Sequence, residues 1–144
     1  MISSTIEAVT RLQVIQTLCL SLSSRLEEDA GMLTIPRNYE YEGQLNGFQE
    51  IAADITESVT QMSVAPSDEM VRTAIQELVH KIEWREILSR QDALKHEKYK
   101  RDYRGMMLYY RPLGTECACK KVMTWLNDAI QVLKIPVEHL ETDD

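Results

Sequence analysis

The sequence predicts an all-α fold, namely a compact bundle of about five helices. Apolar residues recur at steps of three and four along most of the chain, which is the period of helices that bury one face. Sustained alternation of apolar and polar residues, the pattern of a half-buried strand, does not occur. The length of 144 residues is typical of one domain. We therefore expect a single helical domain over residues 1–140 and a disordered acidic tail over residues 141–144.

The first predicted helix begins at Ser4, because Glu7 follows three residues later in the capping-box pattern. Gly31 is its expected C-terminal stop. Residues 31–45 contain two glycines, a proline and an asparagine, so we expect a long loop there. The stripe predicted to face the core is Ala8, Leu12, Ile15, Cys19, Leu22 and Leu26.

The second helix is expected to begin near Asn46, and Pro66 is expected to end that unit. Ser67 should then cap a third helix, since two acidic residues follow it and suit the positive end of a helix. The predicted core stripe of the second helix is Phe48, Ala52, Ile55, Val59 and Met62. The stripe of the third helix is Val71, Ile75, Leu78 and Ile82.

Beyond Ile82 the apolar stripe fails, because the next expected positions are Arg85 and Ser89. We therefore predict a kink or break near residues 88–92, followed by a fourth helix over about 92–110. Pro112 and Gly114 predict a turn. A last helix should then run from Thr115 to Pro136, with the stripe Ala118, Val122, Trp125, Ala129 and Val132.

Positive charge is concentrated in the second half of the chain. The protein carries 16 Lys and Arg against 23 Asp and Glu, a net charge of −7. Residues 81–121 hold eleven of the basic residues and six acidic ones, whereas residues 1–80 hold four and twelve. The negative total disfavours nonspecific binding of the whole molecule to DNA or membranes, so an anionic partner is expected to meet the basic span. The predicted partner-binding residues are Lys95, Lys98, Arg101, Arg104 and Arg111.

Tyrosines are interleaved with these cations over residues 95–111. On one continuous helix, Tyr99, Tyr103 and Tyr110 would share a face with Met106, which predicts an inward stripe opposite an exposed cationic ridge. Two alternatives stay open. The tyrosines could stack on bases, or Gly105 could end the helix and release the tyrosines after it into a loop.

No catalytic, cofactor-binding or metal-binding residues are predicted. Glu77 and His80 form one Glu-x-x-His step, but a di-iron bundle needs a second step and two further inward carboxylates. Glu83 and Glu86 lack the later Glu-x-x-Asp of all-α nucleotide pyrophosphatases, so an ion pair of Glu86 with Arg90 is expected instead.

Cysteine usage and the N-terminus both predict a cytoplasmic protein. The three cysteines form no disulfide framework, there is no signal-peptide pattern, and no apolar run is long enough to span a membrane. Cys19 should be buried in the core. Cys117 should be the more exposed and more reactive thiol, while Cys119 or its neighbour Ala118 fills the core.

Three functions fit the sequence. The first is a non-catalytic helical module that binds nucleic acid or an acidic protein through residues 81–121. The second is a small acidic inhibitor or mimic, of the kind a phage or mobile element encodes, that occupies a basic groove through residues 27–57. The third is a small helical enzyme with an unrecognised site. Homo-oligomerisation is compatible with all three, because apolar stripes also pack between chains. The acidic residues of the second hypothesis are Glu27, Glu28, Asp29, Glu40, Glu42, Glu50, Asp54 and Glu57.

Overall fold

Long α-helices make up most of the chain. The computed structural model describes residues 4–29, 35–62 and 66–140. Within these ranges there are four long helices and no strand, which confirms the all-α class, although about five helices were expected. The elements are α1 (Ser4–Asp29), α2 (Ile35–Gln61), α3 (Asp68–His96), the short 3-10 helix η1 (Glu97–Tyr99) and α4 (Tyr103–Leu133).

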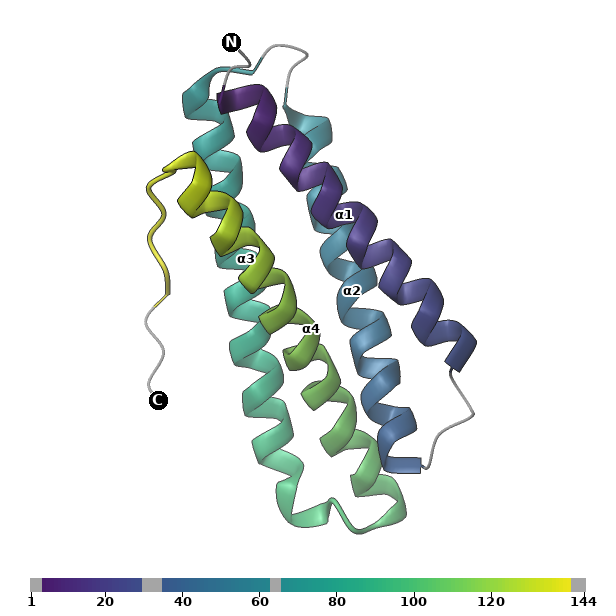
Figure 1. Ribbon diagram of the computed structural model, residues 1–144. Helices are drawn as coiled ribbons and strands as arrows, with labels where there is room; N and C mark the ends of the chain where they lie inside the picture. Colours follow the sequence, from purple (N-terminus) through teal and green to yellow (C-terminus); the bar gives the residue numbers. More distant parts are fainter. Residues whose placement is uncertain (1–3, 30–34, 63–65, 141–144) are drawn as a thin grey trace.

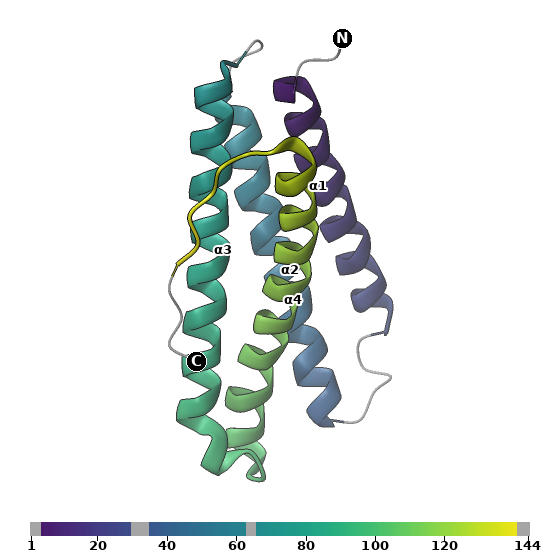
Figure 2. The same ribbon diagram turned by 60° about the vertical axis from the view of Figure 1, so that its left-hand side comes forward.

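Consecutive helices run in opposite directions, so α2 and α4 run the same way (Figure 1). In both orientations α2 and α4 lie in the middle, with α1 and α3 on the outside (Figure 2). The most extensive helix contact is between α2 and α4, whereas α1 packs mainly on α2 and α3 mainly on α4. The bundle is therefore built around a central pair of parallel helices.

Small residues allow this central pair to approach closely. Gly43 and Gly47 on α2 face Gly114 and Ala118 on α4. A Cβ atom added to Gly43 or Gly114 would overlap the backbone of the opposite helix, and one added to Gly47 would lie 2.9 Å from the Cβ of Ala118. Thr115 Oγ1 also donates a hydrogen bond to the carbonyl oxygen of Gly43, at 3.1 Å. The glycines thus serve helix packing.

This contact explains why two predicted irregular segments are helical. The expected loop over 31–45 is wrong, since α2 already begins at Ile35; residues 31–34 lie outside the described residues. Pro36 sits in the first turn of α2, where a helix loses no internal hydrogen bond to proline. The expected turn at Pro112 and Gly114 is also wrong, because both residues lie inside α4.

The predicted break near residues 88–92 and the separate fourth helix over 92–110 are wrong as well, because α3 continues to His96. Of the two polar positions that interrupt its apolar stripe, Arg85 forms ion pairs with α2. Arg85 lies 3.1 Å from Glu50 and 2.8 Å from Asp54 on α2. These pairs replace apolar contacts in the second half of α3 without interrupting the helix.

Most positions of the core stripes predicted for residues 8–82 and 118–132 are buried, and Leu22, Leu26, Val59 and Met62 are partly buried against the core. Ser67 caps α3 by accepting a hydrogen bond from the Met70 amide at 3.2 Å. The Phe48 and Trp125 rings stack with centroids 6.4 Å apart, although Trp125 stays half-buried. The side chain of Val132 and the tail 141–144 lie outside the described residues. The predicted stripe residues that are buried are Ala8, Leu12, Ile15, Cys19, Phe48, Ala52, Ile55, Val71, Ile75, Leu78, Ile82, Ala118, Val122 and Ala129.

The segment after α4 folds back along α3 (Figure 2). The reversal occurs at Lys134, whose φ of 55° lies in the left-handed region. Side chains of α3 then bind the backbone of residues 138–140. Glu83 Oε1 accepts a hydrogen bond from the Leu140 amide at 3.3 Å, and His139 Nδ1 lies 3.2 Å from Glu83 Oε2.

Candidate partner-binding surface

The basic segment forms the end of the bundle where α3 turns into α4. The 3-10 helix η1 follows α3, and backbone hydrogen bonds from Lys100 to Glu97 (3.2 Å) and from Asp102 to Tyr99 (3.0 Å) close the turn. Gly105, in the first turn of α4, packs directly under Tyr99, and a Cβ at this position would overlap the Tyr99 backbone. Gly105 therefore permits the tight reversal of the chain.

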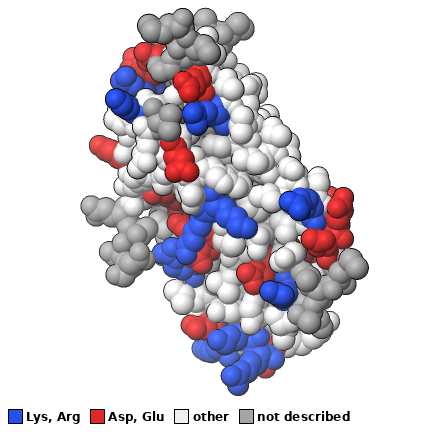
Figure 3. Space-filling model, viewed as in Figure 1, with Lys and Arg blue, Asp and Glu red and all other residues white. Residues whose placement is uncertain are grey.

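Exposed cations gather at this end, which we call the basic tip. Figure 3 shows Lys and Arg clustered at the lower end of the molecule, where α3 joins α4. Within the described part of the chain, none of these side chains forms an ion pair. Two of them lie over tyrosine rings: Lys98 over Tyr99 and Lys100 over Tyr109, 5.1 and 5.6 Å from the ring centroids. The cations of the basic tip are the half-buried Lys100 and the exposed Lys95, Lys98, Arg101 and Arg104.

The tyrosines of the tip are not an inward stripe, so that prediction is wrong. Tyr103 is 76% exposed and Tyr99 is also exposed, because the chain reverses between them and they do not lie on one continuous helix. Tyr99, Tyr103 and the exposed Leu108 line a shallow hollow of about 430 Å³ beside Arg104. The tip therefore combines apolar and aromatic surface with cations that have no counter-ion among the described residues.

Arg111 does not belong to this group. Its Nε and a terminal nitrogen both donate to Glu42 Oε2 on α2, at 2.9 and 2.7 Å, and its guanidinium lies 5.9 Å from the Tyr39 ring centroid. Of the five predicted partner-binding residues, the fold brings Lys95, Lys98, Arg101 and Arg104 to one end, while Arg111 ties α4 to α2.

Much of the acidic surface proposed as an alternative is paired within the molecule. Besides Glu42, the α2 residues Glu50 and Asp54 bind Arg85, and Glu57 lies 4.0 Å from Lys81. These contacts neutralise part of the negative charge of α2.

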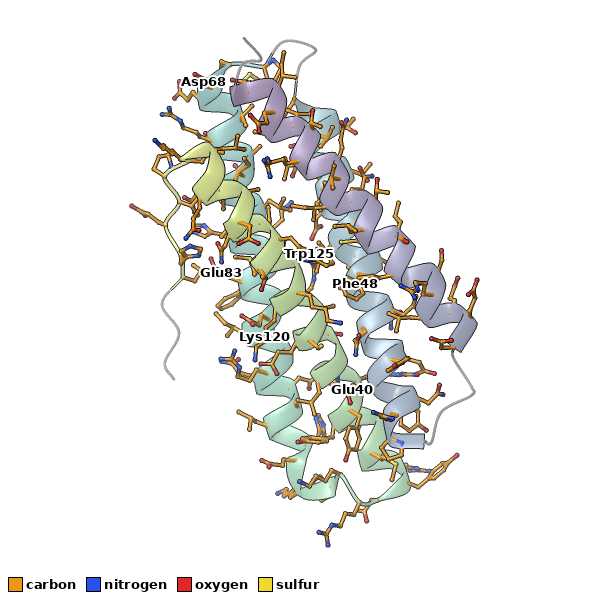
Figure 4. The ribbon with its side chains drawn as sticks, in the orientation of Figure 1. Glu40, Phe48, Asp68, Glu83, Lys120 and Trp125 are labelled. Carbon is orange, nitrogen blue, oxygen red and sulfur yellow. The ribbon has the colours of Figure 1, made fainter. Side chains whose placement is uncertain are left out.

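The residues considered for chemistry serve other contacts. His80 Nε2 lies 2.8 Å from the carbonyl oxygen of Glu138, and Glu83 binds residues 139–140 (Figure 4). Glu86 pairs with Arg90 at 3.9 Å, as expected. Within the described ranges, no three His, Cys, Asp or Glu side chains are grouped to hold a metal ion. No helix among the described residues is long and apolar enough to cross a membrane.

The thiols follow the predicted burial. Cys19 and Cys119 are fully buried, and Cys117 is partly exposed. Burial raises the pKa of both buried thiols to about 12. At neutral pH both buried side chains are therefore almost entirely in the thiol form.

Comparison with known proteins assigns the chain to no family. No protein-family model, no curated protein and no solved structure matches the chain.

Sequence reasoning missed Lys100 and Leu108 as members of the tip. The signal was the run from Lys95 to Asp102, which contains no aliphatic residue and so cannot continue an apolar stripe. That run, followed by Gly105, marks the reversal of the chain more accurately than Pro112 does.

Proposed function

We propose that the protein is a non-catalytic helical module that docks onto an acidic surface of another protein through the basic tip. The observation that carries the proposal is the group of five tip cations beside the exposed ring of Tyr103. Outside the tip, three arginines form ion pairs with carboxylates of neighbouring helices, namely Arg85, Arg90 and Arg111. The tip is where the chain offers clustered positive charge to a partner.

The apolar part of the tip favours a protein over a nucleic acid as partner. Leu108 lines the hollow with Tyr99 and Tyr103, and Leu94 is exposed near the end of α3. Aliphatic side chains contribute to protein interfaces but neither neutralise phosphates nor stack on bases. Tyrosine and arginine are also the residues that most often dominate protein interfaces. In addition, the acidic remainder of the molecule would repel a long polyanion that extended beyond the tip.

The test compares two triple variants that lower the net charge equally. The tip variant carries Lys98→Glu, Arg101→Glu and Arg104→Glu. The control carries Arg72→Glu, Lys121→Glu and Lys134→Glu, which are exposed positions outside the tip. Affinity purification from the native host, with and without nuclease, should retain one stoichiometric protein on the wild type and the control and lose it on the tip variant. Circular dichroism should show that both variants are folded.

Binding kinetics with the purified partner then test the electrostatic role. The tip variant should slow association, and the difference from wild type should shrink as salt is raised, because tip charges act mainly on the encounter. Retention that depends on nucleic acid, or unchanged binding by the tip variant, would contradict the proposal. A partner rich in exposed Lys and Arg would instead direct attention to the acidic residues of 27–57.

A further inference from the structure

We propose that the groove between α1 and α4 is covered by a second copy of this chain, with the two α1 helices packed antiparallel across a two-fold axis that crosses the contact face at the level of residue 16. This surface lies along the side of the bundle and is separate from the basic tip. It therefore concerns self-association and does not depend on the proposed docking function.

The groove is open and mostly apolar. It is a hollow of about 440 Å³ whose apolar lining is Val14, Ile15 and Leu18 of α1 with Trp125 and Ala129 of α4, and whose remaining lining residues are polar or charged. Val14 is 53% exposed and Leu18 is 41% exposed. Trp125 reaches from α4 toward α1 and the ring of Phe48 (Figure 4). A largely uncharged band crosses this face in Figure 3. Apolar surface of this kind is typical of an interaction site.

The groove side of α1 is self-complementary. At 100° per residue, Glu7, Val14, Leu18 and Arg25 fall within about 40° of one another, so they share one face of the helix. Val14 and Leu18 are equally far from Gln16 in opposite directions, and so are Glu7 and Arg25. An antiparallel pair of α1 helices centred there places Val14 against Leu18 of the second copy.

The same geometry matches opposite charges at both ends of the contact. Glu7 of each copy lies opposite Arg25 of the other, about 14 Å along the helix from the axis. Arg25 is exposed and forms no ion pair within the described residues. Glu7 uses Oε1 to pair with Arg11 at 3.3 Å, which leaves Oε2 for a second cation. An isologous interface requires this kind of reciprocal match.

A charge swap tests the arrangement. Arg25→Glu alone and Glu7→Arg alone each place like charges at both ends of the contact. Each should raise the dissociation constant of the dimer roughly 3- to 30-fold. The double variant Glu7→Arg with Arg25→Glu restores opposite charges and should recover dimerisation. Sedimentation equilibrium at several protein concentrations measures each constant.

An apolar substitution with a matched control tests the centre of the contact. Leu18→Glu should abolish the dimer, whereas Leu20→Glu should not, because Leu20 is similarly exposed (49%) but lies on the other flank of α1. The triple variant of the basic tip should dimerise like the wild type. A wild type that is monomeric up to high micromolar concentration, or a dimer indifferent to Leu18→Glu and Arg25→Glu, would overturn the proposal. Circular dichroism establishes that each variant is folded.

Discussion

Gln76 of α3 holds the backbone of Glu138 with two hydrogen bonds. The Glu138 amide donates to Gln76 Oε1 at 2.8 Å, and Gln76 Nε2 donates to the Glu138 carbonyl oxygen at 2.7 Å. One side-chain amide thus satisfies both polar groups of an extended residue, as a neighbouring strand would. This contact fastens the segment after α4 to the side of α3.

We expect Gln76→Ala to release this segment without unfolding the bundle. Each such hydrogen bond contributes a net of about 1 kcal/mol, so loss of one or both should accelerate exchange of the Glu138 amide roughly 5- to 30-fold, while core amides of α3 stay protected. Hydrogen exchange followed by NMR measures both. The control is Gln91→Ala, at an exposed position of the same helix. Equal exchange of the Glu138 amide in wild type and Gln76→Ala would show that the contact adds nothing.

Gly43→Ala and Gly114→Ala should destabilise the protein, although alanine is the better helix former. The added methyl group has no room between α2 and α4, and overpacking of this kind costs about 1–3 kcal/mol of unfolding free energy. Urea unfolding measures the loss. Asn46→Ala, at an exposed site of α2, is the control and should be neutral or slightly stabilising. Wild-type stability of Gly43→Ala would mean that the two helices lie farther apart.

The three thiols should react at very different rates. Cys117 is partly exposed and should be alkylated first in the native protein. Cys19 and Cys119 have pKa values raised to about 12 by burial, so only about one in ten thousand is a thiolate at pH 8. Mass spectrometry of time points measures the order. A Cys117→Ser variant should stay unlabelled until denaturant is added. Fast labelling of Cys19 in the native protein would contradict its position on the core face of α1.

Glu86 should make stability fall as pH rises. Burial raises the pKa of Glu86 above its ordinary value, and Arg90 and Lys120 offset this only in part. The folded state therefore binds this proton more tightly than the unfolded state. The contribution of Glu86 is greatest below the ordinary Glu pKa and is lost as pH rises through the folded pKa. Glu86→Gln mimics the protonated form and keeps the contact between Arg90 and Glu116.

The expected readout is the difference in unfolding free energy between Glu86→Gln and wild type, measured by urea unfolding at several pH values. As pH rises from acidic to neutral, Glu86→Gln should gain stability relative to the wild type. The exposed Glu28→Gln variant reports the effect of removing a surface carboxylate. A difference that moves toward the wild type instead would show that the pair with Arg90 outweighs burial.

The parts predicted correctly from the sequence are those that local periodicity determines. The spacing of Ala8, Leu12, Ile15 and Cys19 identified the core face of α1, and Ser67 identified the start of α3, because a side chain three or four residues away lies on the same helix face whatever surrounds it. Concentrated positive charge over residues 81–121 was likewise visible in the sequence. The sequence did not show which of these cations form ion pairs within the bundle and which are grouped at the tip.

Apart from the missed reversal between Tyr99 and Tyr103, the errors concern residues whose role depends on another helix. Gly43 and Gly114 predicted irregular backbone when read alone, but the tertiary structure uses them for close packing of α2 against α4. Arg85 predicted an interruption, and the carboxylates of Glu50 and Asp54, more than thirty residues earlier, give it a place inside the bundle. Sequence alone thus determined the helical class, the core faces and the charge distribution, because these follow from neighbours along the chain. Tertiary structure decided where the helices end and which cations form ion pairs among the described residues, because those depend on partners distant in sequence.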